Sequence, residues 1–201
     1  MKRIFSGNKQ NLHKNPKIIA VMGSVKGAGC THFAIALAKS IRMIYGKKTA
    51  IIELNGSGDF ERIKNEYVRS NIKKNSCETD MYDIHNVSFY KRISHDRFFE
   101  IYGDAYEYII LDIGENFQKQ KDKIILSDIK CLIACHTPWK YEDNNKAIKW
   151  FDDNLPNKDF KCFNCFGVTH NKKIFRQVPS YASPFELDKN VLSFFIGILE
   201  D

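Results

Sequence analysis

The sequence predicts one α/β domain, built as a doubly wound, mostly parallel sheet with helices on both faces. A chain of 201 residues is long enough for one well-buried core and short for two. Apolar runs of strand length alternate with amphipathic helical segments, which is the pattern of a parallel sheet with crossover helices. Chemistry-bearing residues also gather directly after these strands, where such sheets bind their ligands. We expect residues 1–16 to form a flexible basic leader and residues 17–201 to form the domain.

The first half of the domain begins with a strand, a helix and a strand. Residues 17–24 are a continuous apolar run, residues 31–46 are an amphipathic helix that ends at Gly46, and residues 48–55 are a second buried strand. This succession is a βαβ unit, so the two strands are expected to run parallel. The expected elements that follow are a helix at 59–74, a strand at 86–93 and a short helix at 95–106.

The second half continues the alternation. Its expected elements are buried strands at 106–116 and 130–139, a helix at 139–155 with Trp139, Ile148 and Phe151 on its apolar face, a strand at 160–168 and a helix at 183–200 that begins at Ser183 or Pro184. The last helix is rich in Leu, Phe and Ile, but its polar face is only modestly basic. We therefore expect it to pack on the core and not to lie on a membrane.

The chain shows no signal peptide and no apolar run long enough to span a membrane, so a cytoplasmic location is expected. In that compartment the six cysteines are expected to be free thiols. Cys162 and Cys165 form a CxxC motif, but it lies in a strand, where residues three apart point to opposite faces. Buried structural thiols are therefore the main interpretation, and a zinc site is the alternative.

The net charge of +7 favours an acidic partner such as nucleic acid. The lysines are scattered along the whole chain, however, and the two denser stretches are the leader and residues 62–76. A solvated surface explains both stretches, and a nucleic-acid footprint is the weaker interpretation.

The glycine-rich turn at residues 23–29 is the strongest functional signal, and two cofactor chemistries use such a turn. The spacing of Gly23, Gly27 and Gly29 is GxxxGxG, which fits an NAD(P) loop, and Glu53 at the end of the second strand would then bind a ribose hydroxyl. Short-chain dehydrogenases also need a tyrosine followed four residues later by lysine. Tyr141 comes nearest to this motif, but the next lysine is five residues on.

The second interpretation is a phosphate-binding P-loop, GxxxxGK[ST]. Gly29, Cys30 and Thr31 match the end of that pattern, and Ser24 takes the position of its first glycine. Asp112 follows an apolar strand and precedes a glycine, as does the aspartate that helps a P-loop ATPase to hold Mg²⁺.

These features resemble the ParA/MinD group of P-loop ATPases, of the SIMIBI class, from about Lys17 to the last helix. Within that group the chain is most similar to the TadZ/CpaE-type pilus-assembly localisation proteins, which share an atypical Walker A loop. The resemblance implies ATP or ADP with Mg²⁺, and it assigns cofactor binding to Ser24, Val25, Lys26, Gly27, Ala28, Gly29, Cys30, Thr31, His32 and Asn164. It assigns the metal to Thr31 and Asp112, and base recognition to Asn164.

The sequence departs from the group at the catalytic positions. Cys30 stands where the group has the lysine that neutralises the phosphates, and Lys26 lies one residue after the position of the signature lysine that crosses the dimer. Asn55 replaces the aspartate that positions the attacking water, and an amide cannot accept a proton from it. Asn55 and Lys26 are the candidate catalytic residues, and slow or absent hydrolysis is expected.

Simpler interpretations of these residues stay open. Thr31 would then be a helix cap, Asp112 a turn residue and Asn164 a partner of local backbone. Lys26 would point to solvent, and His32 would be packed or exposed on the first helical turn.

Three functions therefore remain. The first is a nucleotide-binding positioning or assembly factor, which forms a nucleotide-dependent homodimer and serves a protein partner such as secretion or pilus machinery. The second is a pseudo-ATPase scaffold that binds no nucleotide. The third is an NAD(P)-dependent oxidoreductase.

Overall fold

The computed structural model describes residues 15–70, 80–91, 93–156, 159–167 and 174–200, and the expected leader lies almost wholly outside these residues. The strands are β1 (Lys17–Gly23), β2 (Thr49–Glu53), β3 (Met81–Ile84), β4 (Val87–Tyr90), β5 (Tyr108–Gly114), β6 (Ile129–His136), β7 (Lys161–Gly167) and β8 (Phe175–Gln177). The helices are α1 (Cys30–Tyr45), α2 (Asp59–Ser70), α3 (His95–Gly103), α4 (Lys121–Leu126), α5 (Tyr141–Asn154) and α6 (Lys189–Glu200), with 3-10 turns η1 (Phe117–Gln120) and η2 (Pro138–Lys140).

The strands form one sheet in the order β3-β4-β2-β5-β1-β6-β7-β8. All neighbouring strands pair in parallel except β3, which pairs with β4 antiparallel at the edge. The predicted doubly wound, mostly parallel sheet is confirmed. Because β5 lies between β1 and β2, the order differs from that of the dinucleotide-binding fold, in which the first two strands are neighbours.

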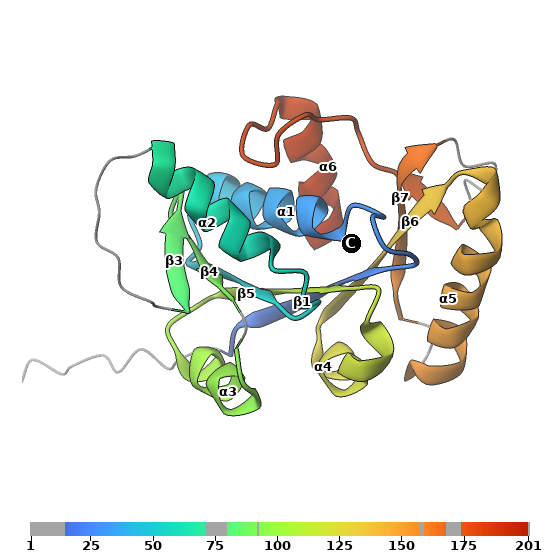
Figure 1. Cartoon of the computed structure of the whole chain (residues 1–201), viewed down its shortest axis with the longest axis horizontal. Helices are drawn as coiled ribbons and strands as arrows, with labels where there is room; N and C mark the ends of the chain where they lie inside the picture. Colours follow the sequence, from blue (N-terminus) through green and yellow to red (C-terminus); the bar gives the residue numbers. More distant parts are fainter. Residues whose placement is uncertain (1–14, 71–79, 92, 157–158, 168–173, 201) are drawn as a thin grey trace, which may run out of the picture.

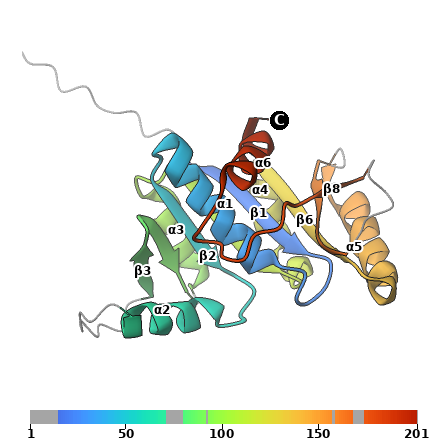
Figure 2. The same ribbon diagram turned by 90° about the horizontal axis from the view of Figure 1, so that it is seen from above.

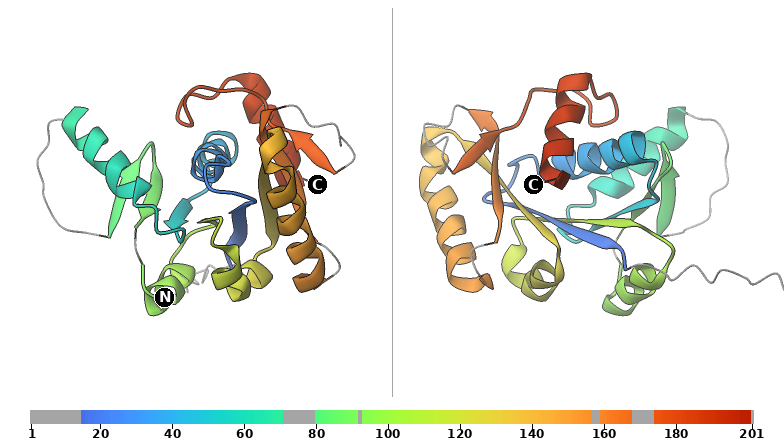
Figure 3. Two further views of the ribbon diagram at one scale, coloured as in Figure 1. Left: turned by 45° about the vertical axis from the view of Figure 1, so that its right-hand side comes forward. Right: turned by 180° about the vertical axis from the view of Figure 1, so that it is seen from behind.

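Helices cover both faces of the sheet (Figure 1). One buried cluster joins the sheet to α1, α2 and α6, and a second joins its other face to α3, α4 and α5. The view from above shows α1 running along β1, with α6 beside it (Figure 2), and the turned views show α5 standing against the β6–β8 end (Figure 3). Aromatic rings bind α1, β7 and α6 together, since Phe33 packs against Phe163, Phe194 and Phe195.

The predicted elements need three corrections. Residues 183–188 are not helical, because α6 begins at Lys189, where Asp188 accepts a hydrogen bond from the backbone N–H of Val191 at 2.9 Å. Trp139 is 77% exposed and lies in η2, so it is not on the packed face of α5. The prediction also omitted β3, α4 and β8. The core role of α6 is confirmed, since five of its residues are buried.

The two thiols of the CxxC motif lie on opposite sides of β7, as predicted. Cys162 belongs to the cluster under α5 and Cys165 packs against the cluster under α1. Among the described residues, no three His, Cys, Asp or Glu side chains are grouped to hold a metal ion. In the same part of the chain, no helix has both the length and the apolar character needed to cross a membrane.

Candidate phosphate and cation site

The loop between β1 and α1 takes its shape from glycines with positive φ. Gly27 has φ of 78° and Gly29 has φ of 98°, both in the left-handed region that glycine adopts without strain. Gly29 is the N-cap of α1, and it makes no side-chain cap. The first turn of α1 also contains no acidic residue. Backbone N–H groups at this helix end therefore stay available for an anion.

A cavity of about 560 Å³ opens over this loop. Its lining comes from the ends of several strands, and comprises Val25, Lys26, Gly27, Ala28, Gly29, Cys30, Thr31, His32, Asn55, Gly56, Ser57, Asp59, Arg62, Gly114, Glu115 and Phe166. The structure thus brings residues 25–32 and Asn55 to one cavity, as the sequence predicts. Ser24, Asp112 and Asn164 are absent from this lining.

A hydrogen-bonded cluster lies at the floor of the loop, where the carboxyl ends of β1, β2 and β5 meet. Thr31 Oγ1 donates to Asp112 Oδ2 at 2.6 Å, so Thr31 is not the cap of α1. Asn55 Nδ2 lies 3.0 Å from the same Oδ2 and 3.4 Å from Thr31 Oγ1. The amide of Asn55 therefore faces the pair formed by Thr31 and Asp112.

Asp112 is fully buried, and burial raises the pKa of its carboxyl to about 7. The hydrogen bond from Thr31 opposes this rise, while the nearby Glu53 adds to it. Asp112 Oδ1 and Glu53 Oε2 are buried without a hydrogen-bond partner among the described residues. Two neighbouring buried carboxyl groups with free oxygens form an electrostatically unfavourable arrangement that a cation relieves.

The thiol of Cys30 packs against Gly23. A Cβ atom added to Gly23 would lie 2.5 Å from Cys30 Sγ, so the thiol fills the space above this glycine. Burial raises the pKa of the Cys30 thiol well above its usual value, and the group is neutral at physiological pH. The loop therefore has no cation at this position, and its exposed cation is Lys26.

Ser24 connects the loop to α5 through a hydrogen bond. Its Oγ donates to Asn144 Oδ1 at 2.5 Å, and Asn144 Nδ2 donates to the carbonyl of Cys135 at 3.0 Å. Asn144 is 1% exposed, so it joins the loop to α5 and β6 inside the core. Sequence reasoning missed Asn144, although an asparagine on the apolar face of a predicted helix was a usable signal.

Asn164 and His32 are both engaged in contacts within the chain. Asn164 is fully buried, and its Nδ2 donates to the carbonyl of Gly167 at 2.9 Å and to Gln177 Oε1 at 2.7 Å. Its Oδ1 accepts from the backbone N–H of His136 at 3.2 Å. The ring of His32 stacks on Tyr181 with 4.7 Å between centroids, and burial lowers the pKa of His32.

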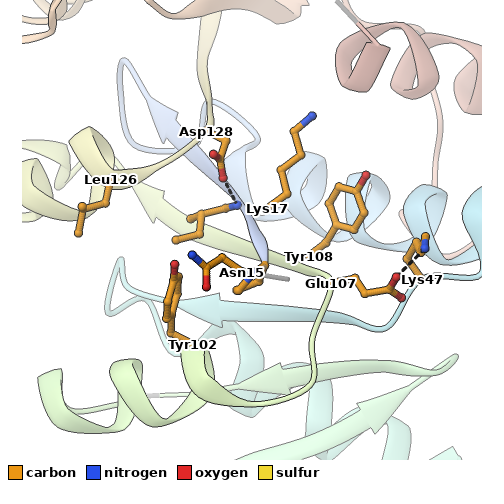
Figure 4. Close-up of a pocket in the computed structure, with 10 residues that line it drawn as sticks. Asn15, Lys17, Lys47, Tyr102, Glu107, Tyr108, Leu126 and Asp128 are labelled. Atoms are coloured by element: carbon orange, nitrogen blue, oxygen red, sulfur yellow. Dashed lines mark hydrogen bonds and ion pairs between the residues drawn. The ribbon is translucent and has the colours of Figure 1, made fainter. Parts of the chain in front are cut away.

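A second cavity, of about 460 Å³, lies at the amino ends of the strands, where β1 and β5 begin (Figure 4). Its charged groups are partnered within the chain: Asp128 Oδ2 accepts from the backbone N–H of Ile18 at 2.7 Å, and Lys47 pairs with Glu107 at 2.5 Å. These pairs hold chain segments together, and among the described residues that line this cavity no buried carboxylate oxygen is left without a hydrogen-bond partner.

Comparisons with known proteins agree with this geometry at the level of the fold. No protein-family model matches the chain, and no curated protein sequence matches it. A solved structure of a plasmid partition protein from Borrelia burgdorferi bound to AMPPNP is similar over 93% of this chain and 98% of that one, at 18% identity and a TM-score of 0.58.

Two further solved structures show the same fold. A ParA family ATPase from Chlorobium tepidum is 10% identical over 90% of both chains, with a TM-score of 0.57. FlhF complexed with GTP and Mg²⁺ is 18% identical over 93% of this chain and 75% of that one, with a TM-score of 0.57. The chain therefore shares its fold with a plasmid partition protein and a ParA family ATPase.

Proposed function

We propose that the chain binds ATP or ADP with Mg²⁺ at the loop of residues 24–32, and that it works as a positioning or assembly factor. The observation that carries this proposal is the pair formed by Thr31 and Asp112 beneath the N-terminus of α1, where the N-cap residue Gly29 makes no side-chain hydrogen bond. Hydroxyl and carboxylate oxygens at this place are the groups that hold Mg²⁺ in P-loop proteins. Solved structures of the same fold hold AMPPNP or GTP with Mg²⁺.

The residues present fit a divalent cation. Asp112 Oδ1 is buried without a partner among the described residues, and a cation coordinated by water supplies one. Asn55 Nδ2 now faces the two oxygens that would hold the ion, so cation binding requires the amide to turn away. When bound, Mg²⁺ neutralises phosphate charge, and Thr31 and Asp112 would hold it. The loop amides and Lys26 bind and orient the phosphates.

Hydrolysis is expected to be slow for two reasons. Cys30 offers a neutral thiol, so the charge that develops on the phosphates lacks its usual lysine. Asn55 orients water at most, since its amide accepts no proton. Each such loss lowers the rate of phosphoryl transfer by a factor of ~10² or more. A long-lived nucleotide-bound state suits a positioning factor, which must stay at its cellular site, more than an enzyme that turns over rapidly.

A nucleotide titration tests the proposal, with ATP, ADP and NADH each added with and without Mg²⁺. We expect ATP and ADP to bind, and Mg²⁺ to tighten ATP binding. The isosteric variant Asp112→Asn should remove the effect of Mg²⁺ and keep the metal-free affinity. No binding at millimolar nucleotide would make the chain a scaffold, and binding of NADH alone would select the oxidoreductase.

A further inference from the structure

At the carboxyl end of β7, an aromatic ring lines the cavity over residues 25–32, and the nearby asparagine amide does not. Asn164, the residue expected to recognise the base, is fully buried and uses both atoms of its amide within the chain. Phe166, two residues later, is 51% exposed and lines the cavity together with residues 25–32. The side chain presented at this strand end is therefore the phenyl ring.

Two local features fix the position of Phe166. The pairing of β6 with β7 shifts register, because Ala134 pairs with Asn164 and the next residue, Cys135, pairs with Phe166. Gly167 has φ of +78°, and a Cβ atom at this position would lie 2.1 Å from the carbonyl oxygen of His136. The strand end is thus held against β6 in a conformation that only glycine permits here.

The phenyl ring stands directly beside the helix end that would hold phosphate. A Cβ atom added to Gly29, the N-cap of α1, would lie 3.3 Å from Cε2 of Phe166. His32 is the other planar ring in the described lining, and Tyr181 already covers one of its faces. Apart from Phe166 and Val25, the described lining of the cavity consists of glycines and of polar or small side chains.

We propose that Phe166 stacks on the base of the nucleotide whose phosphates bind at residues 25–32. This inference rests on the proposed function. A purine has a flat apolar face, and stacking on an aromatic side chain needs no hydrogen-bond reader. The half-exposed ring therefore supplies the affinity for the base, while Asn164 holds the strand end in place.

The test compares ATP with inorganic tripolyphosphate, which carries the charge but no base. Phe166→Ala should weaken ATP binding about tenfold and leave tripolyphosphate binding within about twofold. Phe166→Trp should retain ATP affinity, whereas Phe166→Leu, which keeps apolar bulk without the ring, should lose it. Phe99 is 52% exposed and lies on α3, so Phe99→Ala is the matched control and should leave both affinities unchanged.

Each other outcome overturns the inference. Equal losses for ATP and tripolyphosphate would mean that Phe166 acts on the loop through Gly29. No loss in Phe166→Ala, or full affinity in Phe166→Leu, would mean that the ring does not stack on the base. If the unchanged protein binds tripolyphosphate and ATP, these results refute the stacking alone. If it binds neither, the proposed function fails as well. Far-ultraviolet circular dichroism of each variant verifies that it folds.

Discussion

At the scale of single residues, we expect Cys30 to limit the affinity of the loop for phosphate. Its thiol is 7% exposed, packs over Gly23 and carries no charge at neutral pH. A lysine has a stem long enough to leave this position and bring an ammonium to the cavity.

We predict that Cys30→Lys tightens ATP binding by at least about tenfold, since a charge-assisted phosphate contact contributes about 1.5–3 kcal/mol. Cys30→Met is the matched control, because methionine has similar length and no charge. Isothermal titration measures both variants. Equal affinities of the two variants would contradict the role assigned to charge.

A second prediction concerns Asn55, whose Nδ2 donates to the buried carboxylate of Asp112 at 3.0 Å. Asn55→Asp replaces this donor with a second carboxylate. The variant loses a hydrogen bond to a charged group, so we predict that its free energy of unfolding falls by about 2 kcal/mol without Mg²⁺. Millimolar Mg²⁺ should restore much of that loss, because a cation bridges the two carboxylates.

Thermal unfolding with and without Mg²⁺ measures this effect. Asn116→Asp is the control, since Asn116 Nδ2 donates to the backbone carbonyl of Asn55 at 3.1 Å and not to Asp112. That variant should be destabilised without rescue by Mg²⁺. An Asn55→Asp protein as stable as the unchanged protein in the absence of Mg²⁺ would contradict the role of the hydrogen bond, and a destabilised protein that Mg²⁺ does not rescue would place the cation elsewhere.

At the scale of elements, the sequence predicts buried strands well and edge strands poorly. The strands β1, β2, β5 and β6 are continuous apolar runs, and each was predicted near its observed bounds. The edge strands β3 and β8 were missed, because β3 has four residues of which only Ile84 is buried, and β8 has three residues held by pairing with β7. Their structure depends on a neighbouring strand more than on their own pattern.

The residues of the candidate site likewise fall into those that the sequence predicts and those that it does not. Motif spacing marks residues 25–32, Asn55 and Asp112 in the sequence. In the structure, residues 25–32 and Asn55 line one cavity, and the buried Asp112 is hydrogen-bonded to Thr31 and Asn55; their roles in ligand binding stay a prediction. Asn144 was missed although its place on the apolar face of a predicted helix was a usable signal, and Phe166 was missed because no local motif marks it. Tertiary packing alone brings α5 under Ser24 and turns the end of β7 toward Gly29.

Strand β7 also carries a prediction about its two thiols. Burial raises the pKa of Cys162 and of Cys165 to about 12, and the side chains lie on opposite faces. At pH 7.5 the thiolate fraction is then roughly 10³-fold below that of an ordinary cysteine, so alkylation of both thiols in the folded protein should be slower by a similar factor. Mass spectrometry with iodoacetamide, in native buffer and in guanidinium, measures the ratio.

The same alkylation experiment, repeated after treatment with a metal chelator, distinguishes structural thiols from a zinc site. A metal chelator should change neither the alkylation rates nor the melting temperature if the thiols are structural. Faster alkylation and a lower melting temperature after chelation would show that a metal holds the motif.

At the scale of the whole molecule, the cavity lies at the carboxyl ends of the central strands and opens to solvent. The central strands β1, β2 and β5 supply the floor, and the exposed Lys26 stands at the rim of the cavity. Within the described part of the chain, no ion pair involves Lys26. A second copy that docks over this cavity would bring a nucleotide close to both copies of this lysine.

We therefore predict that ATP with Mg²⁺ promotes a dimer and that Lys26→Ala abolishes this effect without altering the fold. Nucleotide that binds the dimer better than the monomer shifts the equilibrium by mass action, and Lys26 supplies that difference if it contacts the phosphates of the partner. Lys149→Ala is the matched control, because Lys149 is also exposed but lies on α5, away from the cavity. Sedimentation velocity with and without nucleotide measures the change. A chain that sediments as the same monomer in both conditions, while titration shows that it binds ATP, would keep the nucleotide site and refute the role of Lys26 in assembly.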